Sequence, residues 1–162
     1  MEIEVRIRGL MMDPSTNMPI VVLKEVGSDT VMPIWVGIFE ANAIAIEIEK
    51  LPAPRPMTHD LLRNLIRYLN ADLQRVVITE IKDDTFHAVL WLHQDGEELT
   101  IDARPSDAIA LALRADCPIF VSEHVLQTAK LNTSGPPEGP TAEQLRTWLE
   151  GLNDEDLGRY KM

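Results

Sequence analysis

The chain has 162 residues, of which 45% are hydrophobic, and it carries 26 acidic against 15 basic side chains for a formal net charge of −11. This length can bury one sizeable core but is short for two comfortable domains. The negative field repels polyphosphates and anionic lipid surfaces, so nucleic acid is disfavoured as a partner unless a local basic patch or a bound cation makes the contact.

The single cysteine, Cys117, excludes an intrachain disulfide and indicates a reducing compartment. The first eight residues alternate charged and apolar side chains, unlike a signal peptide. No apolar run approaches the roughly 20 residues that a membrane span needs. We therefore expect a cytoplasmic protein that makes no membrane contact.

Three segments of different composition predict the domain organisation. Residues 1–132 carry the regular apolar patterns of a folded domain, and residues 133–140 are a Gly/Pro linker. Residues 141–162 predict a C-terminal amphipathic helix and an acidic tail, with Leu145, Trp148, Leu149 and Leu152 on one helical face.

The first third of the domain predicts three strands and a helix. Apolar and charged residues alternate over residues 2–8, which is typical of a strand with one wet face. The β-branched runs at 19–26 and 30–38 flank Gly27-Ser28-Asp29 and predict a hairpin. Residues 40–50 mix alternating isoleucines with alanines, and we assign them to a helix because alanine favours it.

The middle of the chain predicts an amphipathic helix followed by three more strands. Over residues 58–70 five apolar residues recur at helical spacing and predict a helix packed on a sheet, namely Leu61, Leu62, Leu65, Ile66 and Leu69. Strands are predicted at 75–82, 85–93 and 98–103, with turns at Asp83-Asp84 and Asp95-Gly96. A helix from Ser106 to Ala115, a short strand at 118–121 and a helix from Ser122 complete the domain.

A short internal similarity indicates duplication. The stretch of residues 42–46 matches residues 107–111 at a constant offset of 65 residues (107 − 42), and each follows three predicted strands. The sequence therefore predicts an α+β fold, with a mixed β-sheet, packed helices and pseudo-duplicated βββα units.

Two Arg-Pro segments precede predicted helices. They are Arg55-Pro56-Met57-Thr58-His59-Asp60 and Arg104-Pro105-Ser106-Asp107. Thr58 and Ser106 are placed to cap the helices, and Asp60 and Asp107 suit a first turn. Capping alone accounts for these residues, but it requires neither the arginines nor the histidine. The remaining residue types can support chemistry.

The residue types near these helix starts outline a metal-assisted phosphodiesterase. Asp60, Asp102 and Asp107 supply the hard oxygen ligands that suit a divalent metal, Mg²⁺ or Mn²⁺. The two arginines predict a phosphate site beside the helix starts, and His59 predicts a general base. The phosphate-binding candidates are Arg55, Arg104, Ser106 and Thr58, and the catalytic candidates are His59 and Glu40.

Five blocks, in order, resemble the bifunctional nuclease family. They are Pro33-Ile34-Trp35-Val36-Gly37, Glu40-Ala41-Asn42-Ala43-Ile44-Ala45, the first Arg-Pro segment, residues 102–112 and Pro118-Ile119-Phe120-Val121. The chain is similar to bacterial stand-alone members of that family. The resemblance implies hydrolysis of DNA and/or RNA, the combined activity after which the family is named. The candidate residues named above fall on the family's polar motif positions.

Two further expectations concern the alternative function and assembly. A non-enzymatic module, binding a small anion or serving a regulatory or structural role, also fits the Arg-Pro segments. Carboxylates that converge on one open pocket would favour the enzyme, and carboxylates on different faces would favour the module. A methionine cluster and the apolar face of the C-terminal helix predict a homo-oligomer, a dimer or larger, with the cluster formed by Met11, Met12, Met18 and Met32.

Overall fold

The structure, a computed structural model, describes residues 1–132 as seven strands and four helices. The linker and C-terminal helix predicted for 133–162 lie outside the described residues. No helix in the described part is long and apolar enough to cross a membrane. In chain order the elements are β1 (Glu2–Met12), β2 (Pro19–Glu25), β3 (Val31–Trp35), α1 (Ile38–Ile48), α2 (Thr58–Tyr68), β4 (Ala71–Lys82), β5 (Thr85–Gln94), β6 (Glu97–Ala103), α3 (Pro105–Ala115), β7 (Ile119–Ser122) and α4 (Glu123–Asn132).

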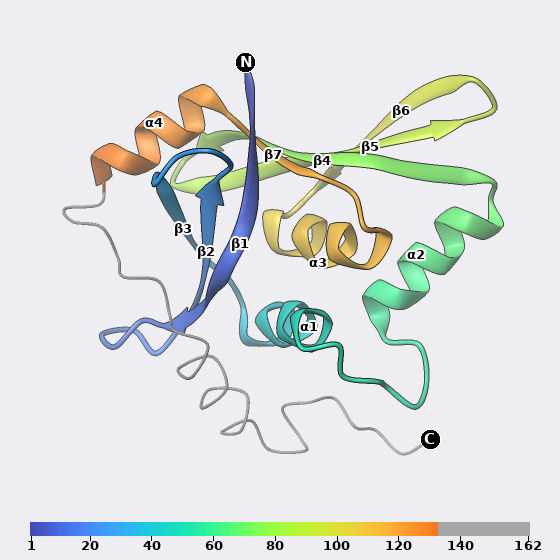
Figure 1. Cartoon of the computed structure of the whole chain (residues 1–162), viewed down its shortest axis with the longest axis horizontal. Coiled ribbons are helices and arrows are strands. Elements are labelled where there is room, and N and C mark those ends of the chain that lie inside the picture. Colours follow the sequence, from blue (N-terminus) through green and yellow to red (C-terminus); the bar gives the residue numbers. More distant parts are fainter. Residues whose placement is uncertain (133–162) are drawn as a thin grey trace.

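All seven strands form one mixed sheet in the order β3-β2-β1-β7-β4-β5-β6 (Figure 1). β1 to β3 make one antiparallel meander and β4 to β6 make another. β7 joins them, antiparallel to β1 and parallel to β4. Each meander is followed by a helix, α1 or α3, and these two helices contact each other. The predicted α+β fold with two βββα units is confirmed.

The second meander is closed by two tight turns that the sequence predicted. Asp83 and Asp84 have φ values of 50° and 58°, and Asp95 and Gly96 have φ values of 51° and 82°. Positive φ at both central residues matches the right-handed twist of the flanking strands. These turns fix the register of β5 on both of its neighbours.

The N-caps of the two helices that follow the Arg-Pro segments lie one and two residues earlier than expected. Met57 is the N-cap of α2 and Arg104 is the N-cap of α3, and neither makes a side-chain capping bond. The prediction that Thr58 and Ser106 act as caps is therefore wrong. Pro105 occupies the first helical position, where its fixed φ is favourable, and this moves the cap to Arg104.

The predicted contact of α2 with the sheet is present, and Ile66 packs against the core, but the predicted leucines face away from it. α2 contacts α3 and β4, but His59 is its one buried residue. Leu61, Leu65 and Leu69 are 53%, 48% and 64% exposed. The apolar periodicity identified the helix correctly but did not reveal which side faces the core.

Candidate active site

Four polar side chains from three helices meet where α3 begins. Glu40 comes from α1, His59 from α2, Arg104 caps α3, and Asp107 lies in the first turn of α3. Arg104 Nη2 lies 2.8 Å from Glu40 Oε1, and Arg104 Nε donates to Asp107 Oδ2 at 2.8 Å. His59 Nε2 lies 2.9 Å from Asp107 Oδ1. We call these four residues the polar cluster.

The charges of the polar cluster reinforce one another. Burial alone would raise the pKa of the Asp107 carboxyl, but hydrogen bonds from Arg104 and His59 outweigh it and hold that pKa below its ordinary value. The hydrogen bonds to Asp107 and Glu40 raise the pKa of Arg104 further above its already high value. Asp107 is therefore an anion and Arg104 a cation throughout the physiological range.

His59 and Arg104 differ sharply in their access to solvent. The His59 side chain is 10% exposed, with its Nε2 directed at Asp107, whereas the Arg104 side chain is 65% exposed. A carboxylate that accepts from one ring nitrogen of a histidine fixes the ring orientation and leaves the other nitrogen to exchange protons. Arg104 has five N–H donors, and only some of them are used by its two carboxylate partners.

Gly37 creates the space that Glu40 occupies. Gly37 is the N-cap of α1, and a Cβ atom there would collide with Glu40 Oε2. The Glu40 side chain is 17% exposed, so the absence of a side chain at Gly37 lets this carboxylate fold back over the helix start and reach Arg104. The sequence block that contains Gly37 thus helps to shape the polar cluster.

A second arginine, Arg114, ties the three helices together beneath the surface. Its side chain is 1% exposed, and its Nε donates to Asp60 Oδ1 of α2 at 2.9 Å. Its other nitrogens donate to the carbonyl oxygens of Ala110 in α3 at 2.9 Å and Ala43 in α1 at 3.0 Å. Asp60 Oδ2 in turn accepts from the backbone N–H of Met57 at 2.9 Å. Arg114 therefore fixes the helices that carry the polar cluster.

Sequence reasoning missed Arg114. A cation in the last turn of a helix is favoured by the helix dipole alone, so its position carried no sign of burial. Its flanking alanines and leucines gave the only available signal. A charged residue inside an almost wholly apolar helix needs a buried partner if it does not reach solvent.

The three predicted metal ligands do not come together. Asp60 binds Arg114 whereas Asp107 binds Arg104, and these contacts lie on different turns of α3. Asp102 pairs with Val89 in the strand register, and the adjacent Ile101 pairs with buried Leu90. Successive strand residues point to opposite faces, so Asp102 lies on the sheet face away from the one Leu90 shares with the core.

The described residues therefore do not form the expected three-aspartate cation site. No group of three His, Cys, Asp or Glu side chains within residues 1–132 is arranged to hold a metal ion. Of the three predicted aspartates, the two on the helix side, Asp60 and Asp107, each accept a hydrogen bond from an arginine. The predicted three-aspartate set consequently has no common coordination point.

Of the other predicted phosphate ligands, Ser106 lies next to the polar cluster in the chain, whereas Arg55 and Thr58 are not part of it. Arg55 lies exposed in the segment before α2, Thr58 is exposed at the start of that helix, and Ser106 is buried in the first turn of α3. Arg104 is the predicted phosphate ligand that the structure places within the polar cluster itself.

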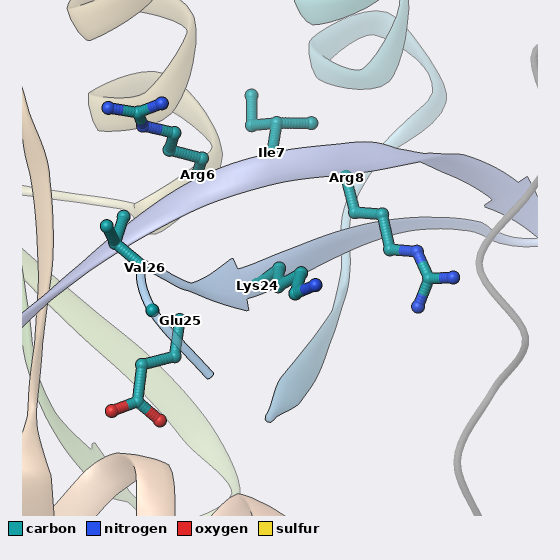
Figure 2. Close-up of a pocket in the computed structure, with 7 residues that line it drawn as sticks. Arg6, Ile7, Arg8, Lys24, Glu25 and Val26 are labelled. Atoms are coloured by element: carbon teal, nitrogen blue, oxygen red, sulfur yellow. The ribbon is translucent and has the colours of Figure 1, made fainter. Parts of the chain in front are cut away.

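A pocket of about 260 Å³ beside β1 and β2 is separate from the polar cluster (Figure 2). Its lining includes Arg6, Arg8 and Lys24, which raises the question of an anion site. Figure 2 shows the guanidinium groups of Arg6 and Arg8 pointing away from each other, and Lys24 Nζ is paired with Asp29 at 3.0 Å. These cations do not converge on one ligand position.

Comparisons with known proteins identify a matching family and several relatives. The family described as "Bifunctional nuclease domain" matches residues 21–134, a range that contains the whole polar cluster and Arg114. An uncharacterized protein of Mycobacterium tuberculosis is 37% identical over 162 residues, covering 95% of this chain and 97% of its own length.

Plant relatives are more distant and longer. Bifunctional nuclease 1 of Oryza sativa subsp. indica is 28% identical over 127 residues, covering 76% of this chain and 38% of the plant protein. Bifunctional nuclease 1 of Arabidopsis thaliana is 26% identical, covering 73% of this chain and 40% of that protein. The chain thus spans less than half of each plant relative. From its domain match and its relatives, the chain belongs to the bifunctional nuclease domain family.

Proposed function

We propose that the chain hydrolyses phosphodiester bonds of nucleic acid, DNA and/or RNA, at the polar cluster. The observation that carries the proposal is the 2.9 Å contact between His59 Nε2 and Asp107 Oδ1, beside an arginine that is 65% exposed. The names of the plant relatives support the same reaction class.

His59 is the proposed proton acceptor. Its Nε2 contacts Asp107, so we assign the proton transfer to the other ring nitrogen, Nδ1, which would take a proton from the attacking water as the water oxygen bonds to phosphorus. The bond from phosphorus to the leaving oxygen then breaks, and that oxygen takes up a proton. Asp107 acts as the positioning residue, because its negative charge stabilises the imidazolium that forms.

Arg104 and the start of α3 are the proposed phosphate contacts. Pro105 has no N–H, but the backbone N–H groups of Ser106 and Asp107 lie in the first turn, where helices leave N–H groups without an intrahelical acceptor. Arg104 adds a charged, bidentate donor at the same helix end. Glu40 is proposed to orient Arg104 and to yield some of its hydrogen bonds when a phosphate binds.

The three predicted aspartates do not converge, so the proposed steps use side chains alone. Assays with and without Mg²⁺ or Mn²⁺ determine whether hydrolysis requires a divalent metal. Activity that survives a chelator would support hydrolysis by the side chains alone. Activity that depends on added metal would require a ligand set different from the three aspartates.

The test measures cleavage of labelled single-stranded RNA and DNA by the full chain, with Mn²⁺, with Mg²⁺ and with a chelator. We expect His59→Gln and Asp107→Asn to lower the rate at least 100-fold, the usual contribution of a general base. His93→Gln is the matched control, because His93 is an exposed histidine on β5. Equal rates in wild type, His59→Gln and His93→Gln would refute the proposed site and indicate a contaminating nuclease.

A second candidate is a non-enzymatic module that binds a small anion or stabilises the fold. The specific observation in its favour is that Arg104 is already paired with both Glu40 and Asp107. If this candidate is correct, wild type shows no turnover, and Arg104→Ala abolishes phosphate binding or lowers the unfolding temperature. Cleavage that requires His59 would exclude it.

A further inference from the structure

The apolar side of α2 faces away from the rest of the domain. At 100° per residue, five large apolar residues fall within an arc of about 120°. The opposite side carries buried His59 and partly buried Ile66 and Arg63. We call the exposed arc the outer stripe, which consists of Leu61 (53% exposed), Leu62 (40%), Leu65 (48%), Tyr68 (87%) and Leu69 (64%).

The outer stripe ends beside a second uncovered apolar area on β6. Leu99 and Ile101 pair in register with buried Leu92 and Leu90, so they lie on the sheet face that belongs to the core. They remain 40% and 50% exposed, because α3 contacts β4 and β5 and does not extend over β6. Within residues 1–132 no helix covers this strand.

A hydrogen bond links these two areas. Gln94 at the end of β5 donates from Nε2 to the carbonyl oxygen of Leu69 at 2.6 Å. Gln94 also pairs with Glu97, the first residue of β6. The C-terminal end of α2 therefore lies beside the end of β5, and Figure 1 shows it leading into β4 on the side of the sheet where the β5–β6 turn lies.

We propose that this surface binds a second copy of the chain across a two-fold axis, with the outer stripe of each copy packed on the α2 and β6 surface of the other. In a two-fold symmetric contact both copies use the same surface, which must therefore be complementary to itself. Here the outer stripe of α2, which packs on no described strand, lies next to the face of β6, which no described helix covers. Seven large, half-exposed apolar side chains form the centre of the roughly 800 Å² per partner that a stable interface buries.

The apolar character of this surface, rather than its charge, favours a copy of this chain as the partner. The chain carries a net charge of −11, and Arg63 and Arg67 of α2 lie on the side of the helix opposite the outer stripe. Two copies therefore meet through apolar side chains, while their net negative charges repel each other. The apolar centre gives no means to read a phosphate backbone, so nucleic acid does not fit this surface.

The proposed interface differs from the two surfaces that the sequence predicted. Of the four methionines at the first hairpin, Met32 is fully buried and Met18 is 42% exposed, so that region offers a smaller apolar surface than α2 does. The proposal is independent of the proposed function, although α2 also carries His59.

The test is the molar mass of the full chain by light scattering and sedimentation across the micromolar range. We expect wild type at twice the 18.2 kDa of one chain. Leu65→Glu and Ile101→Glu should each weaken the dimer at least tenfold, and added salt should strengthen it by screening the repulsion between acidic copies. Val26→Glu is the matched control, because Val26 is 44% exposed and lies outside the surface.

Circular dichroism should show all three variants folded, because each changed side chain is already 44–50% exposed. A wild-type mass of 18.2 kDa at every concentration would overturn the proposal, and so would a dimer that both Leu65→Glu and Ile101→Glu leave intact. The first of these results indicates that another part of the chain covers the outer stripe, and the second indicates a different interface.

Discussion

Replacing Arg114 by alanine tests whether this arginine holds the three site helices together. The substitution removes a side chain that is 1% exposed, with donated bonds to Asp60, Ala110 and Ala43. It leaves the Asp60 carboxylate between α2 and α3 without its counter-ion.

The expected loss of stability follows from the degree of burial. Removing one partner of a buried ion pair destabilises a protein by about 3–5 kcal/mol. The Asp60 side chain is 21% exposed, so water can partly solvate the carboxylate that remains. We therefore expect the lower end, about 3 kcal/mol, which corresponds to a fall in unfolding temperature of roughly 10 °C for a domain of this size.

Urea and thermal unfolding followed by circular dichroism measure this loss. Arg67→Ala is the control, because it removes an exposed arginine of α2 and should change stability by no more than about 0.5 kcal/mol. The double variant Asp60→Asn with Arg114→Met should lose less than the sum of the single variants, since it removes both charges. Equal stabilities for Arg114→Ala and Arg67→Ala would refute the linking role.

Three further predictions concern the polar cluster and the cysteine. Gly37→Ala should leave the fold intact but displace the flexible end of Glu40, so in a crystal structure Arg104 would keep Asp107 and lose Glu40; an unchanged Glu40 would contradict this. The pKa of Asp107 is lowered in the folded state, so its stabilisation is complete above the unfolded value of 3.8 and is lost as pH falls through the folded pKa. Asp107→Asn should therefore reduce the loss of unfolding free energy that occurs as pH falls in the acid range. The same loss in wild type and variant would contradict the lowered pKa of Asp107. Burial raises the pKa of the Cys117 thiol to about 11, so a thiol reagent at pH 7 should label it far more slowly in the folded than in the unfolded chain, and equal rates would contradict this.

The fold was predictable because its signals are local. Turn residues at Asp83-Asp84 and Asp95-Gly96 fix both hairpins of the second meander, and the alternation in β1 fixes a strand. Strand boundaries were less accurate, since β4 begins at Ala71 rather than Arg75. The register across the sheet and the orientation of α2 depend on distant contacts, which periodicity does not encode.

The sequence predicted which residues belong to the candidate site, but it did not predict which of them contact one another. His59 and Arg104 were chosen because helix capping requires neither, and Asp107 and Glu40 were chosen as carboxylates near predicted helix starts. The contact between His59 and Asp107 spans 48 residues. Grouping the aspartates by their charge suggested a metal, whereas in the structure each helix-bound aspartate is held by an arginine.

The two arginines of α3 differ in burial and therefore in the role that we expect of each. Arg114 is buried and bonds to backbone carbonyls and Asp60, so its geometry can change only if the helices move. Arg104 is 65% exposed and bonds only to carboxylates, so an incoming anion can compete with Glu40 for it while the helices stay in place. A substitution at Arg104 should therefore alter anion binding with little loss of stability, and a substitution at Arg114 should alter stability first. Their location on one helix makes α3 the element on which both the fold and the proposed chemistry depend.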